Sequence, residues 1–167
     1  MRLMPVLLSV SLSLVAANAA AREYVGASKP PTDAKAREIA SLFDTWNAAL
    51  ATGNPKRVTA LYASNGILQP TVSNEVRVGP AAIERYFVDF LKAKPQGTIN
   101  YREIRMLDAD TALDAGVYTF TLTKDGKPTK VQARYTYLYE KVDGVWKIMS
   151  HHSSAMPEVP VAKGAAR

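Results

Sequence analysis

The chain has 167 residues, of which 21 are Lys or Arg, 15 are Asp or Glu, two are His and none is Cys. The lack of Cys excludes disulfides, iron–sulfur clusters and thiolate zinc sites, and two His are too few for a three-His zinc centre. The composition, 47% hydrophobic and 22% charged, is typical of one globular domain, and the formal charge of +6 is spread along the chain without a basic run. We therefore predict no metal, no cofactor and no nucleic-acid partner.

The first 21 residues have the pattern of a secretory signal peptide. Arg2 precedes an apolar stretch from Met4 to Ala16, and small residues follow around Ala19. A basic start, a short apolar segment and an Ala-x-Ala site are the three parts of such a signal. The stretch is shorter than the ~20 residues that a membrane-spanning helix needs. We therefore expect residues 1–21 to be removed and the protein to be exported, to a periplasm or the medium, with no membrane contact after cleavage.

Three helices are predicted after an extended lead-in at residues 22–31. The first follows a capping residue at Thr32 or Asp33 and ends at Gly53, where a left-handed turn favours glycine. Its apolar residues share one face of a helix: Ile39, Leu42, Phe43, Trp46, Ala49 and Leu50. The second and third helices each begin with a first-turn proline: Pro55 and Pro80. Helices that are apolar on one side need another layer to cover that side.

Everything after Pro95 is typical of β-strands. Four segments rich in Val, Ile, Thr, Tyr and Phe are separated by Asp-containing turns: Ile99–Leu107, Thr111–Leu122, Val131–Glu140 and Val145–Ser154. Two shorter strands, Ile67–Thr71 and Glu75–Val78, are predicted between the second and third helices. Helices followed by an antiparallel sheet indicate an α+β fold. We expect residues 32–157 to form a single domain and residues 158–167 to form a C-terminal tail.

The register of the last predicted hairpin decides which His faces the helices. With Val142 opposite Val145, alternation places His152 beside Tyr135 on the core face and His151 on the other face. A one-residue bulge would exchange the two His, so one of them faces the helices in either register. The inward His is either a core residue satisfied by a tyrosine or a carbonyl, or a hydrogen-bonding or acid–base group, since imidazole titrates near about pH 6.5. Both are therefore candidate catalytic residues.

Arg134 lies in a strand that is otherwise rich in aromatic residues. An unpaired guanidinium in an apolar cavity is very costly, so Arg134 faces water, a carboxylate partner or an anionic ligand. Arg102 and Arg105 fall on opposite faces of their strand, so at most one of them joins Arg134 in a pocket. Several tyrosines could belong to the core or line the same pocket. The candidate ligand-binding residues are Arg134, Arg102, His151, His152, Tyr62, Tyr118 and Tyr137.

The order of these elements, with Leu61-Tyr62-Ala63, Arg85-Tyr86-Phe87 and the closing segment Asp143–Ser154, resembles the nuclear-transport-factor-2-like (cystatin-like) superfamily. More narrowly, residues 35–157 resemble the bacterial SgcJ/EcaC-type relatives of the calcium/calmodulin-dependent protein kinase II association domain. The resemblance implies a cone-shaped fold, in which a curved antiparallel sheet wraps around N-terminal helices and leaves a cavity at its open end. A homodimer or larger homo-oligomer is also expected. Kinase activity is not implied, because the chain has no kinase motif.

Three functions remain open from the sequence. The first is an exported domain that forms a homo-oligomer and binds a small molecule without turning it over, the molecule being anionic if Arg134 faces it. The second is a lyase or isomerase in which the inward His acts as general base in the cone cavity. The third is an oligomerisation scaffold with no ligand.

Overall fold

The computed structural model describes residues 24–71 and 73–157. The helices are α1 (Ala34–Ala51), α2 (Pro55–Thr59), α3 (Gly79–Phe90) and the short 3-10 helix η1 (Leu91–Ala93). The strands are β1 (Tyr62–Gln69), β2 (Arg77–Val78), β3 (Gln96–Met106), β4 (Thr111–Lys124), β5 (Lys127–Val142) and β6 (Val145–Ala155). The expected signal peptide and C-terminal tail lie outside the described residues. No helix in the described ranges combines the length and the apolar character needed to cross a membrane.

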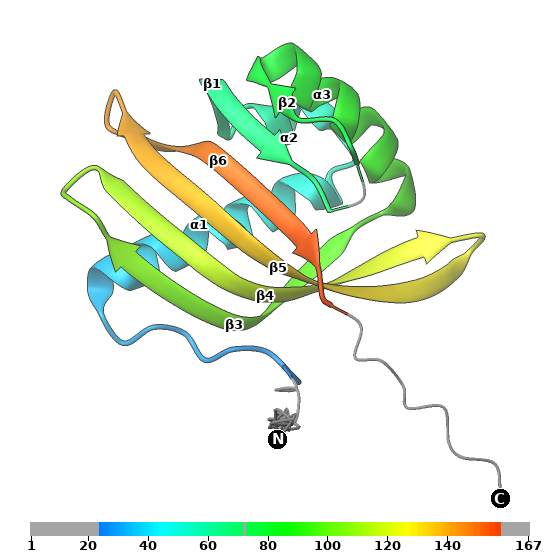
Figure 1. The fold of residues 1–167 in the computed structure, drawn as a ribbon, viewed down its shortest axis with the longest axis horizontal. Coiled ribbons are helices and arrows are strands. Elements are labelled where there is room, and N and C mark those ends of the chain that lie inside the picture. The colour runs from blue at the N-terminus through cyan, green and yellow to red at the C-terminus, as the bar shows by residue number, and fades with distance from the viewer. Residues whose placement is uncertain (1–23, 72, 158–167) are drawn as a thin grey trace, which may run out of the picture.

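The strands form one six-stranded sheet in the order β2-β1-β6-β5-β4-β3. Figure 1 shows α1 lying across one face of this curved sheet, with α2 and α3 at the end where β1 and β2 lie. This arrangement confirms the predicted α+β class. The sheet is mixed, however, because β1 and β6 run parallel while the other neighbours are antiparallel. These two strands are far apart in the chain and share no hairpin turn, so the sequence pattern could not predict the direction of their pairing.

Helix α1 begins and packs as its sequence predicts. The carboxylate of Asp33 accepts a hydrogen bond from the Ala36 backbone N–H at 2.9 Å, which caps the first turn. Gly53 follows the helix with a φ of 65°, the left-handed conformation that glycine adopts at little cost. The six apolar residues predicted to share one face of α1, here called its apolar stripe, all lie in the core or pack against it. Burying side chains of this size stabilises a fold by about 1.5–3 kcal/mol each, so this stripe holds α1 on the sheet.

The β5–β6 hairpin keeps the predicted register only near its turn. Val142 pairs with Val145, as expected. Farther from the turn the register shifts, and Leu138 pairs with Ser150, which leaves Met149 as an extra residue in β6. A bulge of this kind turns every later side chain of its strand to the opposite face.

The bulge places His151 inside the molecule. His151 pairs with Tyr137 and is buried, whereas His152 pairs with Thr136 and is exposed on the outer face. The prediction that one His faces the helices is confirmed. The simple register, which placed His152 inward beside Tyr135, is wrong because it lacks the extra residue.

Candidate functional site

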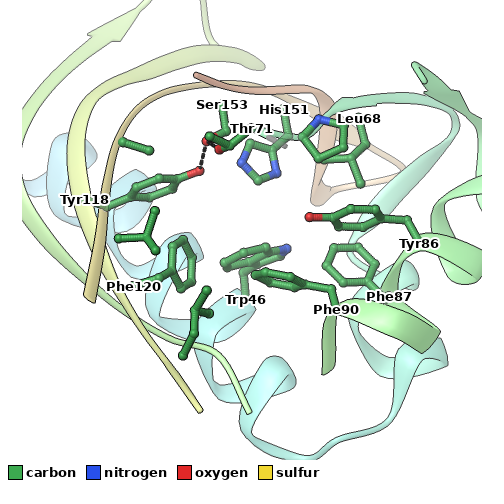
Figure 2. Close-up of a pocket in the computed structure, with 14 residues that line it drawn as sticks. Trp46, Leu68, Thr71, Tyr86, Phe87, Phe90, Tyr118, Phe120, His151 and Ser153 are labelled. Atoms are coloured by element: carbon green, nitrogen blue, oxygen red, sulfur yellow. Dashed lines mark hydrogen bonds between the residues drawn. The ribbon is translucent and has the colours of Figure 1, made fainter. Parts of the chain in front are cut away.

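A cavity of about 110 Å³ lies between the inner face of the sheet and the helices α1 and α3. Figure 2 shows its lining, which comes from both helices and from strands on both sides of β6. Aromatic rings form much of the wall: Trp46, Tyr86, Phe87, Phe90, Tyr118 and Phe120. No Asp, Glu, Lys or Arg lines the cavity. An apolar cavity of roughly 150 Å³ can hold benzene, so this somewhat smaller space limits a ligand to about one small ring.

His151 is the imidazole that reaches this cavity. Its ring stacks on Tyr137 with centroids 4.1 Å apart, and its Nδ1 lies 3.0 Å from the hydroxyl oxygen of Tyr62. Burial, with a smaller effect from His152, lowers the pKa of His151 from 6.5 to about 3. The imidazole is therefore neutral at neutral pH. Its Nε2 is buried and has no hydrogen-bond partner among the described residues.

Three hydroxyl groups form a connected edge of the cavity beside His151. The Tyr118 hydroxyl donates to Ser153 Oγ at 2.6 Å, and Ser153 shares a short hydrogen bond with Thr71 Oγ1. Figure 2 shows this connection at one side of the space. Burial raises the pKa of Tyr118, so its phenol stays protonated. These hydroxyls already bond to one another, whereas the Nε2 of His151 has no partner among the described residues.

The predicted tyrosines take two different places. Tyr118 lies in the cavity wall, as expected. Tyr62 and Tyr137 are buried and touch His151, but neither lines the cavity. Their expected place in the wall is therefore wrong. The Tyr62 hydroxyl forms a hydrogen bond with Nδ1 of His151, and Tyr137 stacks on the imidazole ring. Both tyrosines therefore orient the imidazole.

Arg134 and His152 lie outside the cavity. Both are on the outer face of the sheet, where they border a shallow depression, and Arg134 Nη2 donates to the Ala155 carbonyl at 3.3 Å. Alternation along β5 explains the position of Arg134, because its neighbour Tyr135 faces inward. His152 faces outward because it follows the inward His151. The predicted clamp of a cavity ligand by Arg134 is wrong, and His152 is wrong as a cavity residue.

Arg102 faces inward but belongs to a second, separate polar cluster. Its Nε lies 3.2 Å from Asp114 Oδ2, and the Tyr135 hydroxyl donates to Asp114 Oδ1 at 2.9 Å. Asp114 is fully buried, and this desolvation raises its pKa from 3.8 to about 6, although the Arg102 charge opposes the shift. Arg102 borders a different cleft of about 420 Å³, between α1, β3 and the lead-in. The structure therefore does not bring Arg102 and His151 into one site.

Tyr86 is a cavity residue that the sequence analysis did not select. It lies on α3, and Figure 2 shows its hydroxyl pointing into the cavity. Burial raises the pKa of Tyr86 to about 12, against the opposing charge of Arg77. The helical spacing of Ile83, Tyr86, Phe87 and Phe90 marks the inner face of α3 and was the available signal.

The cavity lining offers no strong general base among the described residues. A general base works best when its pKa lies near the operating pH, and a pKa of about 3 makes His151 a weak base. The cavity lining holds no carboxylate that could take this role. Across residues 24–71 and 73–157, no three His, Cys, Asp or Glu side chains group together in a way that could hold a metal ion.

Comparisons with known proteins place the chain in a family. The family model described as calcium/calmodulin-dependent protein kinase II association domain matches residues 35–157. A crystal structure described as such an association domain, from Xanthomonas campestris, has 62% sequence identity and a TM-score of 0.81, and the match covers 83% of this chain and 99% of that chain. A search of curated proteins finds no match.

More distant structures share the fold. The hub homology domain of this kinase from Chlamydomonas reinhardtii has 22% identity and a TM-score of 0.64, over 75% of this chain and 100% of that chain. A nuclear-transport-factor-2-like protein with a cystatin-like fold from Novosphingobium aromaticivorans has 13% identity and a TM-score of 0.62, over 75% and 84% of the two chains. The resemblance seen in the sequence is thus confirmed: the chain belongs to the calcium/calmodulin-dependent protein kinase II association-domain family, within the nuclear-transport-factor-2-like (cystatin-like) fold.

Proposed function

We propose that this protein is a homo-oligomeric domain that binds a small molecule in its cavity without turning it over. The observation that carries the proposal is the aromatic cavity of about 110 Å³ with the neutral, buried His151 in its wall. Ligand sites are typically concave and mostly apolar, with a few polar groups that fix orientation. The cavity meets that description, because few polar atoms of its lining lack a partner among the described residues: Nε2 of His151, Nε1 of Trp46 and the hydroxyl of Tyr86.

The lining favours an uncharged ligand. An unpaired ion is costly to move from water into an apolar space, and no charged side chain lines this one. The expectation of an anionic ligand depended on Arg134, which lies on the other face of the sheet. We therefore replace the anion with a neutral, predominantly apolar molecule.

Self-association is the second part of the proposal. The family is named for an association domain, and the relative from Chlamydomonas is described as a hub homology domain. Among the described residues, no helix covers the outer face of the sheet (Figure 1). Apolar residues lie on that face in three strands: Ile67, Leu113 and Leu138. An uncovered sheet face with apolar residues near its centre suits a second copy of this chain.

Export is the third part, and it rests on the sequence of residues 1–21. We expect the protein recovered from a bacterial periplasm or medium to begin after Ala19 or Ala21. N-terminal sequencing of that protein tests this expectation. A chain that retains Met1 in the cytoplasmic fraction would contradict it.

A thermal-shift screen tests the binding function. We expect small neutral ring compounds such as toluene to raise the melting temperature of the wild-type protein. Ala133 lines the cavity, so Ala133→Leu should fill it and weaken binding at least tenfold. The matched control Ala109→Leu, in an exposed turn, should bind as the wild type does. Equal binding by Ala133→Leu, or no stabilisation by any compound, would refute the proposal.

A nuclear Overhauser measurement on the wild-type protein complements the screen, because it needs no variant. Protons of bound toluene should show contacts to the methyl groups of Leu122 and Ala133, which lie in the cavity wall. Contacts confined to the outer face of the sheet would place binding elsewhere and contradict the proposal.

A further inference from the structure

We infer that the ligand carries an uncharged carbonyl oxygen, which accepts hydrogen bonds from the Nε2–H of His151 and the hydroxyl of Tyr86. The inference rests on the proposed binding function and names the chemical class of the ligand: a small ketone, lactone or ester whose apolar body fills the cavity.

The hydroxyl of Tyr62 decides which nitrogen of His151 carries the proton. A neutral imidazole has one N–H donor and one acceptor nitrogen. If the Tyr62 hydroxyl donates to Nδ1, across the observed 3.0 Å, both groups are satisfied and the proton sits on Nε2. In the opposite tautomer Nδ1–H would donate to the Tyr62 oxygen, and the buried Tyr62 proton would need another acceptor. Among the described residues the Tyr62 hydroxyl makes no hydrogen bond to an acceptor other than His151, so the Nε2–H tautomer leaves fewer polar groups unpaired.

This tautomer leaves a buried donor at the wall of the cavity. His151 is 4% exposed, lines the cavity and has no partner for Nε2. The stacked Tyr137 and the bonded Tyr62 hold the ring in one orientation. Buried polar groups in native proteins nearly always have a partner, so an N–H held in this way indicates an acceptor in the cavity.

Tyr86 provides a second donor from another wall. Its ring stacks on Phe90 with centroids 5.5 Å apart, which fixes it on the inner side of α3. Figure 2 shows its hydroxyl and the His151 ring directed into the same space. No hydrogen bond joins this hydroxyl to another described residue. Because burial outweighs the charge of Arg77 nearby, the phenol stays protonated and remains a donor.

Two donors directed at one apolar space match a carbonyl oxygen. Such an oxygen has two lone pairs and can accept both bonds. A carboxylate would bring a charge that no lining residue neutralises. An alcohol could accept both bonds, but its own proton would then need an acceptor, a demand that a carbonyl oxygen does not make. The carbonyl group is the acceptor that pairs both donors and brings no charge or donor of its own.

Three probes of nearly equal shape test the inference: cyclopentanone, cyclopentanol and methylenecyclopentane. They are titrated by NMR into the full-length mature protein. We expect cyclopentanone to bind at least tenfold tighter than methylenecyclopentane, with cyclopentanol between them. His151→Phe should abolish this preference while the hydrocarbon still binds, and Tyr86→Phe should reduce it severalfold. The control Tyr139→Phe removes a buried hydroxyl outside the cavity lining and should keep the full preference.

The outcomes separate this inference from the proposed function. If the hydrocarbon and the ketone bind equally well, the carbonyl inference is wrong and the binding function stands. If no probe binds, both fail. Long-range ¹H–¹⁵N spectra of the wild type report the tautomer of His151 without any variant. We expect the Nε2–H form and a shift of its nitrogen signals on adding cyclopentanone, whereas the Nδ1–H form would overturn the inference.

Discussion

The imidazole of His151 is neutral because burial disfavours its charged form. Its pKa of about 3 lies below the value of 6.5 for a histidine in the unfolded chain. Between these values the unfolded chain binds a proton that the folded chain does not bind, so acid favours unfolding. The stabilising contribution of this residue is complete above pH 6.5 and is lost as the pH falls toward 3.

Replacing His151 should therefore change how stability depends on pH. Wild-type stability is expected to fall by up to about 1.4 kcal/mol per pH unit from this group as the pH decreases from 6.5. His151→Phe should remove that slope, as measured by urea unfolding at several pH values. His152→Phe, on the exposed outer face, should leave the slope in place. An unchanged slope in His151→Phe would mean that this histidine is not the buried, neutral one.

Asp114 should act in the opposite direction over a similar range. Burial raises its pKa to about 6, so the folded chain keeps a proton that the unfolded chain releases between pH 3.8 and 6. This group therefore stabilises the fold at low pH, and the contribution is lost as the pH rises through 6. On acidification, the loss of stability caused by His151 is therefore partly offset by the gain caused by Asp114.

Asp114→Asn should expose both roles of this carboxyl group. At pH 7 it leaves Arg102 without its counter-charge, and losing one partner of a buried pair typically costs about 3–5 kcal/mol. On acidification the variant should lose stability more steeply than the wild type, because the compensation is gone. Chemical unfolding at pH 7 and pH 5 measures both effects. If the stability of the variant changed with pH only as steeply as that of the wild type, the raised pKa of Asp114 would be contradicted.

At the level of elements, the β5–β6 hairpin marks the boundary of what the sequence can predict. Turn chemistry at Asp143-Gly144 and strand alternation correctly predict the first pairs. The bulge at Met149 has no local signature. Next to it β1 joins β6 as a parallel neighbour, and the Ile148 N–H donates to the Leu61 carbonyl at 2.9 Å. A contact between segments that are distant in sequence accompanies the shift, so local patterns could not reveal it.

The same limit explains the errors at the candidate site. Helical periodicity predicted the buried stripe of α1, because burial of one helix face is a local property of the sequence. The cavity instead depends on how α3 and the strands pack together. Sequence reasoning therefore identified Tyr118 and the presence of one inward His, and it missed Tyr86. It also named Arg134 and His152 as candidates, although both lie on the outer face of the sheet.

Gly116 tests the packing of β3 against β4. A Cβ added there would lie 2.0 Å from the Tyr101 carbonyl oxygen, which is a backbone atom of the paired strand β3. We expect Gly116→Ala to destabilise the fold by at least about 1–3 kcal/mol, the usual cost of overpacking. The control Thr121→Ala, in the same strand, should change stability far less. Thermal unfolding of both variants decides, and a neutral Gly116→Ala would contradict the described strand pairing.

At the scale of the whole molecule, we propose ligand binding in the cavity on the inner side of the sheet and self-association through its outer face. Light scattering at micromolar concentration should show a homo-oligomer. Leu138→Glu, on the outer face of β5, should dissociate it and leave toluene binding intact, since Leu138 does not line the cavity. Val78→Glu, on the exposed edge strand, should leave the oligomer unchanged. A monomeric wild type would refute the association part.

A crystal structure of the mature protein grown with cyclopentanone tests the central claim most directly. The account predicts the ketone inside the cavity, with its oxygen roughly 2.7–3.2 Å from the Nε2 of His151. A cavity closed by side chains, or a ketone bound only on the outer face beside Arg134, would contradict it.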